Sequence, residues 1–255
     1  MSAGARGVTL ITGASAGLGV QFARQCRARG ETIVLVARRK ERLEALRREL
    51  GDSVFVHAAD LTRPDQVEGM FGWLEGEGLE IATLINNAGF GTTGNFADTP
   101  RERLLEMIDL NVRSLTDLCR LVLPAMIARR SGGILNVAST AAFQAGPYAA
   151  VYYATKAYVL SLTEALHHEA KGSGVKVSAL CPGPTATEFF EVAGAPNSKL
   201  ARMAVRPDGV VAAGLKGLDR NDPIVIPGIA NKVGAFGTRF MPRSALRRIV
   251  ASLKS

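Results

Sequence analysis

The stretch TGASAGLG, residues 12–19, decides the fold of this chain. It follows the apolar run Val8–Ile11 and opens a segment, Gly17–Arg29, whose spacing predicts a helix. Backbone N–H groups at a helix N-terminus carry partial positive charge, so a pyrophosphate fits there. Three glycines let the backbone turn and approach such a ligand without a Cβ in the way. The spacing differs from G-x-G-x-x-G, and a tight turn that holds no ligand is the alternative interpretation.

Seven short apolar, β-branched runs alternate along the chain with longer helical segments. Their apolar residues are consecutive, which is typical of parallel strands covered on both faces. No repeat or linker divides the 255 residues. We therefore predict one α/β domain over residues 1–255, a doubly wound parallel Rossmann-like sheet flanked by helices. The predicted strands are Val8–Ile11, Thr32–Ala37, Ser53–Ala58, Thr83–Asn86, Gly133–Ala138, Lys176–Leu180 and Ile224–Ile226.

Two helix starts carry the pattern of a capping box. Thr62–Asp65 and Thr99–Glu102 each place an acid three residues after a threonine. We expect each threonine hydroxyl to accept a backbone N–H at the start of the helix that follows.

Composition is that of an ordinary globular protein, with 47% hydrophobic and 21% charged residues. Cys26, Cys119 and Cys181 lie far apart without a C-x-x-C pair, so we expect reduced core thiols rather than disulfides or a zinc site. The three histidines lack metal-ligand spacing, and no metal is expected. No apolar stretch reaches the ~20 residues of a membrane span, and no signal peptide is recognisable, which predicts a cytoplasmic location.

The formal net charge of +8 raises the question of an anionic partner. Much of the excess falls in residues 37–50 and in a basic C-terminal extension at about 231–255. No nucleic-acid-binding motif accompanies it, so no nucleic acid partner is expected. A solvated helix surface is the simplest interpretation of both segments, and contact with an anionic surface stays open.

A second signal lies at the end of the second predicted strand, in VARRKE. Dinucleotide-binding units that use NAD place an acid near this point to bind the ribose 2′-hydroxyl, whereas an Arg accommodates the 2′-phosphate of NADP. Here Arg38 and Arg39 follow Ala37, and no acid occurs before Glu41. This favours NADP(H) over NAD(H), because a guanidinium matches a phosphate. The alternative is that both arginines only begin a charged surface helix.

A third signal is VYYATKAYV, in which Tyr152 and Lys156 share one face of a predicted helix. A free tyrosine has a pKa near 10 and is a poor acid–base group at neutral pH. A nearby ammonium group is expected to lower that pKa. Spacing favours Tyr152 as the reactive residue, with Tyr148 and Tyr153 as local competitors.

These residues together resemble the short-chain dehydrogenase/reductase family from Val8 to about Ile226. The matching pieces stand in the family's order: TGASAGLG, Asp60-Leu61, NNAG at 86–89, Asn111 in DLNV, Ser139 in NVAST, Tyr152 with Lys156, and PGPTAT at 182–187. The resemblance implies a cofactor site made of Gly13, Ser15, Gly17, Leu18, Gly19, Arg38, Arg39, Asp60, Leu61, Asn87, Ala88, Gly89, Tyr152, Lys156, Pro182, Gly183, Thr185 and Thr187.

The resemblance also implies individual roles. Asp60 and Leu61 would bound the adenine pocket, residues 87–89 would run beside the adenosine ribose, and Thr187 would meet the carboxamide. The catalytic residues would be Ser139, Tyr152, Lys156 and Asn111. Asn111 would hold a water that relays protons to Lys156, which would bond the nicotinamide ribose.

Reduction of a ketone needs a hydride, which a nicotinamide supplies, and a proton, which Tyr152 would donate. Ser139 would stabilise charge on the carbonyl oxygen. We therefore expect an NADP(H)-dependent oxidoreductase that interconverts a carbonyl and an alcohol. The alternative function is an NADP(H)-sensing protein without turnover, which would need the glycine loop but no acid–base helix.

Apolar residues near these motifs favour an apolar ketone, aldehyde or 3-oxoacyl substrate over a sugar. A Pro-, Gly- and Ala-rich insertion at about 182–207 is expected to act as a substrate lid. Lys199 and Arg202 within it could attract a phosphate-bearing acyl carrier. The resemblance also implies a homodimer or homotetramer, since family members commonly pair the helices at Pro100–Arg130 and Val151–Lys171 across a two-fold axis. The residues expected to line the substrate pocket are Phe90, Phe96, Ala141, Ala142, Phe143, Ala145, Phe189, Phe190, Val192 and Met203.

Overall fold

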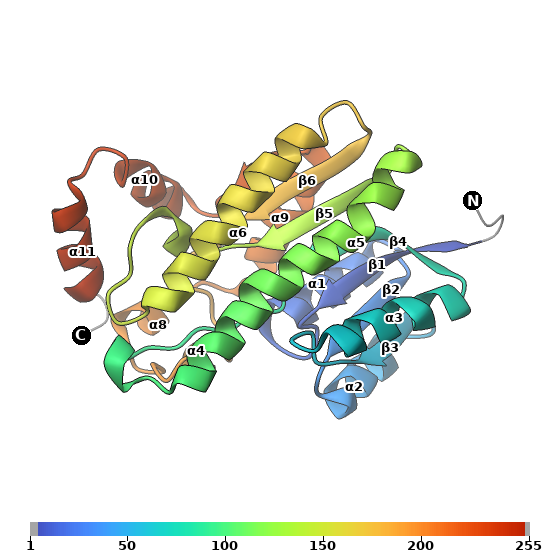
Figure 1. The fold of residues 1–255 in the computed structure, drawn as a ribbon, viewed down its shortest axis with the longest axis horizontal. Coiled ribbons are helices and arrows are strands. Elements are labelled where there is room, and N and C mark those ends of the chain that lie inside the picture. The colour runs from blue at the N-terminus through green and yellow to red at the C-terminus, as the bar shows by residue number, and fades with distance from the viewer. Residues whose placement is uncertain (1–4, 253–255) are drawn as a thin grey trace.

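A parallel sheet of seven strands runs through the centre of the protein in the order β3-β2-β1-β4-β5-β6-β7 (Figure 1). The computed structural model describes residues 5–252. All seven predicted strands are present, with boundaries shifted by a few residues. The strands are β1 Arg6–Thr12, β2 Ile33–Ala37, β3 Val54–Ala58, β4 Leu79–Asn86, β5 Gly132–Val137, β6 Val175–Leu180 and β7 Ile224–Val225.

Strand β4 shows why the observed strand boundaries differ from the predicted ones. Its last residues, Leu84–Asn86, are buried in succession, and the apolar run there predicted a strand. Its first residues, Leu79–Ala82, alternate between buried and exposed because only one face is covered at that end. A search for consecutive apolar residues finds the doubly covered half of such a strand and misses the other half.

Helices cover both faces of the sheet, as predicted. One face packs against α1 (Gly17–Ala28), α2 (Lys40–Leu50) and α9 (Pro207–Arg220), with Phe22 fully buried between them and the strands. The other face packs against α3 (Pro64–Gly76), α5 (Leu115–Ala128) and α6 (Ala150–Glu169), with Met70 and Met126 fully buried. The chain is thus a doubly wound α/β sandwich with a hydrophobic core on each side of the sheet.

The strand order reverses direction between β1 and β4, since the chain runs outward to β3 and then returns. In open parallel sheets, ligands bind in the crevice at the carboxyl ends of the strands where this reversal occurs. The glycine loop follows β1 and the NNAG motif follows β4, so the two motifs meet there.

Both predicted capping boxes are wrong. The N-cap residues of α3 and of α4 (Arg101–Ile108) are Arg63 and Pro100, and neither cap has a side-chain hydrogen bond. The Thr62 hydroxyl instead donates to Asp60 Oδ1 at 2.8 Å, and the Thr99 hydroxyl donates to the Asn95 carbonyl, also at 2.8 Å. Each helix starts one residue later than the pattern requires.

Shorter elements lie outside the two main helical layers. A π-helical turn, η2 (Asp109–Ser114), joins α4 to α5, and 3₁₀ turns occur at η1 (Phe96–Asp98) and η3 (Thr140–Phe143). Helices α7 (Phe189–Val192) and α8 (Lys199–Arg202) lie in the long connection between β6 and α9. The last described helices are α10 (Ile229–Gly237) and α11 (Arg243–Ser252), which stand at the left edge of Figure 1.

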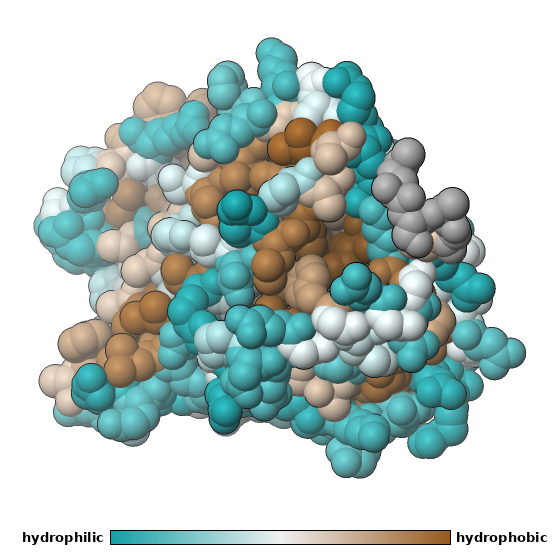
Figure 2. All heavy atoms as spheres, turned by 45° about the vertical axis from the view of Figure 1, so that its right-hand side comes forward, coloured by the Kyte–Doolittle hydropathy of each residue, from teal (hydrophilic) through white to brown (hydrophobic). Residues whose placement is uncertain are grey.

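Apolar side chains gather in the middle of the face shown in Figure 2, with hydrophilic ones around them. The exposed large apolar residues on α4, α5 and α6 are Leu105, Ile108, Leu121, Ile127 and Tyr158. The three cysteines are buried free thiols, as predicted. Within residues 5–252, none of the helices is both long enough and apolar enough to cross a bilayer.

Candidate active site

The glycine loop is held in a conformation that only glycine adopts easily. Gly13 has φ +64°, and a Cβ there would lie 2.8 Å from Ala88 Cα. Gly17 has φ +55°, and a Cβ would lie 3.1 Å from the Thr187 side chain. A Cβ on Gly19 would collide with the Gly13 carbonyl at 2.2 Å, so this glycine lets α1 start directly against the loop. The N-terminus of α1 therefore opens onto a cradle of bare backbone.

The NNAG motif is fastened to the start of this loop. The backbone N–H groups of Asn87 and Ala88 both donate to Thr12 Oγ1 at 2.9 Å, and Asn87 Nδ2 donates to the Thr12 carbonyl at 2.9 Å. Asp60 and Leu61 follow β3 on the other side of the loop and line the same cavity as Gly89. The residues that were predicted to surround an adenosine are thus brought together at the carboxyl edge of the sheet.

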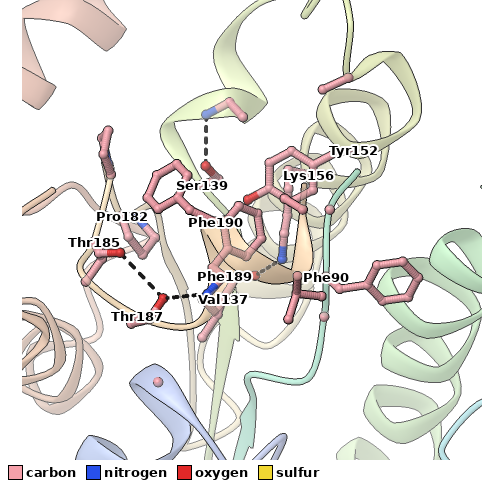
Figure 3. A pocket seen from close by; sticks show the side chains of 18 of the residues that line it. Phe90, Val137, Ser139, Tyr152, Lys156, Pro182, Thr185, Thr187, Phe189 and Phe190 are labelled. Carbon is pink, nitrogen blue, oxygen red and sulfur yellow. Dashed lines mark hydrogen bonds between the residues drawn. The ribbon is translucent and has the colours of Figure 1, made fainter. Parts of the chain in front are cut away.

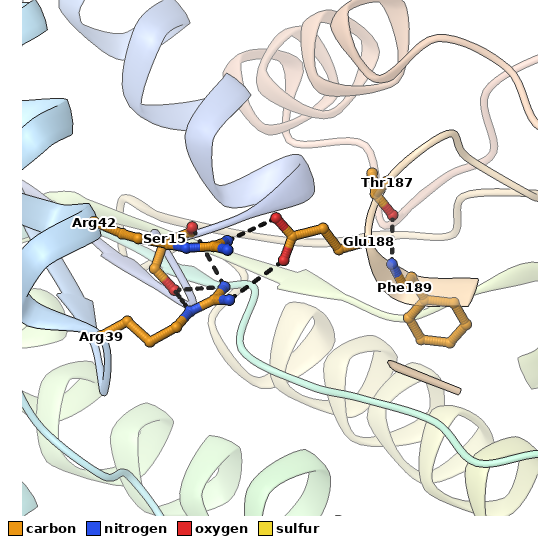
Figure 4. Close-up of polar contacts among 6 residues, drawn as sticks. All are labelled: Ser15, Arg39, Arg42, Thr187, Glu188 and Phe189. Carbon is orange, nitrogen blue, oxygen red and sulfur yellow. Dashed lines mark hydrogen bonds and ion pairs between the residues drawn. The ribbon is translucent and has the colours of Figure 1, made fainter. Parts of the chain in front are cut away.

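The two predicted phosphate-binding arginines lie at that edge and already have partners. Arg38 pairs with Glu106 of α4 at 3.1 Å. Arg39 contacts Ser15 Oγ of the glycine loop at 3.2 Å and pairs with Glu188 at 3.3 Å (Figure 4). Arg42 completes the cluster with a 2.6 Å ion pair to Glu188, and these contacts hold the pKa of Glu188 below its usual value. Two guanidinium groups therefore lie beside the loop with one carboxylate between them.

Ser139, Tyr152 and Lys156 meet in one part of the cavity (Figure 3). Ser139 lies just beyond β5 and caps η3, where its Oγ accepts the Ala141 N–H at 3.1 Å. Tyr152 and Lys156 come from successive turns of α6, and Lys156 Nζ lies 5.9 Å from the centre of the Tyr152 ring. Lys156 Nζ donates to the Val137 carbonyl at 2.7 Å, which ties α6 to the end of β5. The face of α6 that carries Tyr152 and Lys156 therefore forms part of the cavity wall.

The expected lowering of the Tyr152 pKa by Lys156 is wrong in this structure. Burial raises the pKa of Tyr152 to about 12, and a hydrogen bond from Ser139 offsets only part of this increase. Burial also lowers the pKa of Lys156 to about 8. Burial disfavours the charged form of both groups, and Lys156 directs its ammonium group at a carbonyl rather than at the phenol. The structure therefore holds Tyr152 as a protonated phenol at neutral pH.

Asn111 lies in the π-helical turn η2 and is buried. Its side chain accepts the Phe90 N–H at 3.1 Å and donates to the Phe90 carbonyl at 2.9 Å and to Thr155 Oγ1 at 3.1 Å. A Cβ on Gly89 would lie 2.9 Å from Asn111 Oδ1 and 3.4 Å from Lys156 Nζ, so Gly89 leaves the space between them open. A π turn inside a long helix is frequent at functional sites.

The segment 182–207 forms a loop over the cavity, and hydrogen bonds join the two ends of the loop. Val205 returns to its base, donating to the Pro184 carbonyl at 3.0 Å and accepting from Ala186 at 2.9 Å. Thr187 bonds within the segment: its Oγ1 donates to the Thr185 carbonyl and accepts the Phe189 N–H. The Phe189 ring lies 5.3 Å from the Tyr152 ring. Pro182, Gly183, Thr185 and Thr187, which the resemblance assigns to the cofactor site, all line the cavity.

The cavity has a volume of about 860 Å³, near the upper end of the range of ligand and cofactor sites, about 300–1,000 Å³. Four of the predicted pocket residues do not line it: Phe96 is exposed on η1, Ala145 is exposed, and Ala142 and Phe143 pack against the core. Lys199 is committed to the Ser252 carbonyl at 3.0 Å. The predicted apolar lining that the structure confirms consists of Phe90, Ala141, Phe189, Phe190, Val192 and Met203.

Sequence reasoning missed a whole wall of this cavity. Asn231, Thr238, Leu246 and Val250 of the C-terminal extension line it, although that extension was interpreted as a solvated surface. Asn231 reaches the opposite wall, since a Cβ on Gly183 would lie 2.5 Å from its side chain. The available signal was the spacing of Leu246 and Val250, which are one helical turn apart. Glu188 was also missed, and nothing in its local sequence marks it as a partner of α2.

Comparison with known proteins agrees with this architecture. The family model described as short chain dehydrogenase matches residues 7–197. The NADP-dependent 3-hydroxy acid dehydrogenase YdfG of Escherichia coli is 36% identical over 189 residues, which cover 72% of this chain and 75% of that protein.

Solved structures resemble nearly the whole chain. A short-chain dehydrogenase from Sphingobium yanoikuyae in complex with NADPH is 35% identical, with a TM-score of 0.81 and 94% of both chains covered. The bulky-bulky ketone specific alcohol dehydrogenase from Comamonas testosteroni is 30% identical, with a TM-score of 0.76, covering 94% of this chain and 92% of that chain. This chain belongs to the short-chain dehydrogenase/reductase family, and it is an oxidoreductase of that family.

Proposed function

We propose that this protein transfers hydride between NADP(H) and an apolar ketone, aldehyde or 3-oxoacyl compound, or the corresponding alcohol. The observation that carries the proposal is the convergence of Ser139, Tyr152 and Lys156 on one cavity that also contains the glycine cradle. A binding protein without turnover would need the cradle but not this cluster.

The residues present fit a nicotinamide dinucleotide. Side chains at positions 13, 17 and 19 would fill the space at the start of α1, and glycine leaves that backbone free to bind a pyrophosphate. Arg38 and Arg39 would bind the 2′-phosphate, and Lys156 would hold the nicotinamide ribose. When bound, the nicotinamide supplies the hydride.

The chain itself supplies the proton and the stabilisation of charge. With a pKa of about 12, Tyr152 carries its proton at neutral pH and can donate it to the developing alkoxide. Ser139, whose Oγ accepts the Ala141 N–H, would donate its hydroxyl proton to the same oxygen in place of its contact with Tyr152. In the oxidation direction, Tyr152 would first have to lose its proton, and a positive charge on Lys156 would stabilise the phenolate that then accepts the proton of the alcohol.

The preference for NADP(H) is tested by Arg38→Asp and Arg39→Asp, each measured against both cofactors. A charge-assisted hydrogen bond to phosphate contributes roughly 1.5–3 kcal/mol, so each loss should weaken NADPH binding by about ten- to a hundredfold. Binding of NADH should stay unchanged or improve. Equal affinity of the unmodified protein for NADPH and NADH would contradict the assignment.

The apolar lining supports a hydrophobic substrate, because burial of hydrocarbon contributes ~25 cal/mol per Å². The similarity to a dehydrogenase described as specific for bulky-bulky ketones points the same way. The deciding experiment follows NADPH oxidation with a panel of ketones, aldehydes, 3-oxoacyl thioesters and sugars. We expect kcat/KM to rise with the apolar size of the substrate, and a preference for sugars over apolar ketones of equal size would refute the proposal.

A further inference from the structure

Helix α10 carries a stripe of exposed apolar side chains on the side that faces away from the cavity. Ile229, Val233 and Phe236 are 82%, 66% and 59% exposed, and Phe240, in the turn after the helix, is 73% exposed. Their spacing of four, three and four residues aligns them along one helix face. The Phe236 and Phe240 rings pack edge to face with their centres 5.1 Å apart. The stripe is therefore continuous and faces away from the protein core.

The opposite side of α10 faces the active-site cavity. Asn231, Gly234 and Thr238 line that cavity, and each lies on the helix side away from the stripe. Leu246 and Val250 of α11 line the same wall. The single helix α10 thus separates the cavity from an apolar outer surface.

Basic residues accompany the stripe along the sequence of α10 and α11, and acidic residues do not. After Asp222 the sequence contains no Asp or Glu. At 100° per residue, Lys232 and Arg239 flank the stripe on one side of α10. Arg243, Arg247 and Arg248 add three exposed charges on α11, and none of these five residues forms a salt bridge within residues 5–252. Within the described residues, no ion pair therefore neutralises the positive charge of these five side chains.

We propose that α10 and α11 form a surface that docks on an anionic lipid bilayer. A bilayer satisfies both halves of the surface, since phosphate headgroups attract the arginines and the acyl boundary accepts the isoleucine, valine and phenylalanines. A second copy of the chain fits less well, because a two-fold interface through this face would bring the basic cluster against itself. Nucleic acid would match the charge but would leave the stripe in water.

The location gives the docking a consequence that rests on the proposed function. Because α10 and α11 form one wall of the cavity, docking would place that wall against the bilayer, where apolar ketones and acyl chains are concentrated. The substrate class is then a carbonyl compound dissolved in the membrane.

Co-sedimentation with vesicles tests the docking surface without any substrate. Vesicles of phosphatidylcholine alone are compared with vesicles that also contain phosphatidylglycerol. We expect the protein to bind the anionic vesicles at least about tenfold more strongly, and binding to weaken as salt is added. Each basic residue near an anionic surface contributes about fivefold, so Arg243→Gln with Arg247→Gln should reduce binding by more than tenfold.

Phe236→Ser with Phe240→Ser should reduce vesicle binding to a similar extent. The matched controls are Phe96→Ser, an exposed phenylalanine of η1, and Arg47→Gln with Arg48→Gln on α2, and both should bind like the unmodified protein. Thermal unfolding and NADPH binding establish that every variant is folded.

Three outcomes would overturn the proposal. The first is equal binding of the protein to neutral and anionic vesicles. The second is that the arginine variant loses binding to vesicles while the phenylalanine variant keeps it. The third is that the phenylalanine variant binds vesicles normally but has a different mass by light scattering. NADPH oxidation with a water-soluble ketone, measured without vesicles, tests the proposed function separately, so failure of one is distinguishable from failure of the other.

Discussion

At the scale of single residues, the environment of Tyr152 sets the direction of the proton chemistry. The phenol is buried against Phe189 and receives a hydrogen bond from Ser139, and its pKa is about 12. In this structure the phenol of Tyr152 is protonated and can donate its proton to a substrate oxygen. Lowering of its pKa by a cation requires Lys156 to be charged, and burial of Lys156 works against that.

Tyr152→Phe removes only the hydroxyl group. We expect kcat to fall by about 10²–10⁴-fold, because general acid–base catalysis contributes that much, while NADPH binding is retained. Steady-state kinetics and fluorescence titration with NADPH measure the two effects. Tyr158→Phe, on the exposed side of the same helix, is the control. If Tyr152→Phe kept more than about a tenth of the activity, the proton would have to come from another group.

Lys156→Met should change how stability depends on pH in the protein without cofactor. The pKa of Lys156 is lowered from 10.5 to about 8 on folding, so between these pH values the unfolded chain binds the extra proton. The contribution of Lys156 to stability is therefore present above pH 10.5 and is lost as pH falls through 8. As pH rises from about 8 to 10.5, we expect the free energy of unfolding of the unmodified protein to increase by about 2–3 kcal/mol relative to that of the Met variant.

Urea unfolding of both proteins over this pH range measures the difference directly. Comparison with the variant cancels the titration of the buried cysteines, whose raised pKa values act in the opposite direction. A difference that stays constant with pH would mean that Lys156 has an ordinary pKa.

At the scale of elements, Glu188 links the segment over the cavity to the start of α2. Its carboxylate lies between Arg39 and Arg42, next to Ser15, where the proposed 2′-phosphate would bind (Figure 4). The carboxylate and the phosphate cannot both occupy that position. Glu188 is followed directly by Phe189, so its release would also free the residues that cover Tyr152.

Glu188→Gln should therefore raise the affinity for NADPH. The two ion pairs are about half exposed, and such pairs contribute ~0.2–1 kcal/mol each, so we expect a gain of about two- to thirtyfold. Affinity for NADH, which lacks the 2′-phosphate, should not change. Glu191→Gln, three residues further along in α7, is the matched control. A loss of NADPH affinity would instead show that Glu188 positions Arg39 for the phosphate.

At the scale of the whole molecule, α4, α5 and α6 carry apolar side chains that the monomer leaves exposed. Ile108, Leu121 and Tyr158 are among them, and the lining of the cavity does not use them. A self-complementary apolar face of this kind is expected in a two-fold dimer or a tetramer of higher symmetry. It is separate from the basic surface of α10 and α11.

Light scattering at micromolar concentration should therefore give the mass of a dimer or tetramer. Ile108→Lys with Leu121→Lys should reduce it to that of a monomer, because the charges would face each other across the two-fold axis. Phe96→Ser, outside this face, should leave the mass unchanged. A monomeric mass for the unmodified protein would remove the basis for this prediction.

The sequence by itself determined the fold and the order of the site along the chain. Consecutive apolar runs revealed strands buried on both faces, and the glycine loop revealed a backbone that must stay bare. Tyr152 and Lys156 could be assigned to one helix face because helical spacing is local. These features depend on neighbours within a few residues, which is why the sequence shows them directly.

Only the tertiary structure decided which distant groups meet. Glu188 pairs with Arg39 across 149 positions, and α10 and α11 close the cavity against a loop some 50 residues earlier. The same holds for the pKa of Tyr152, which depends on how completely the surrounding segments exclude water. Such contacts follow from the packing of the helices and loops around the sheet, and spacing along the chain carries no record of that packing.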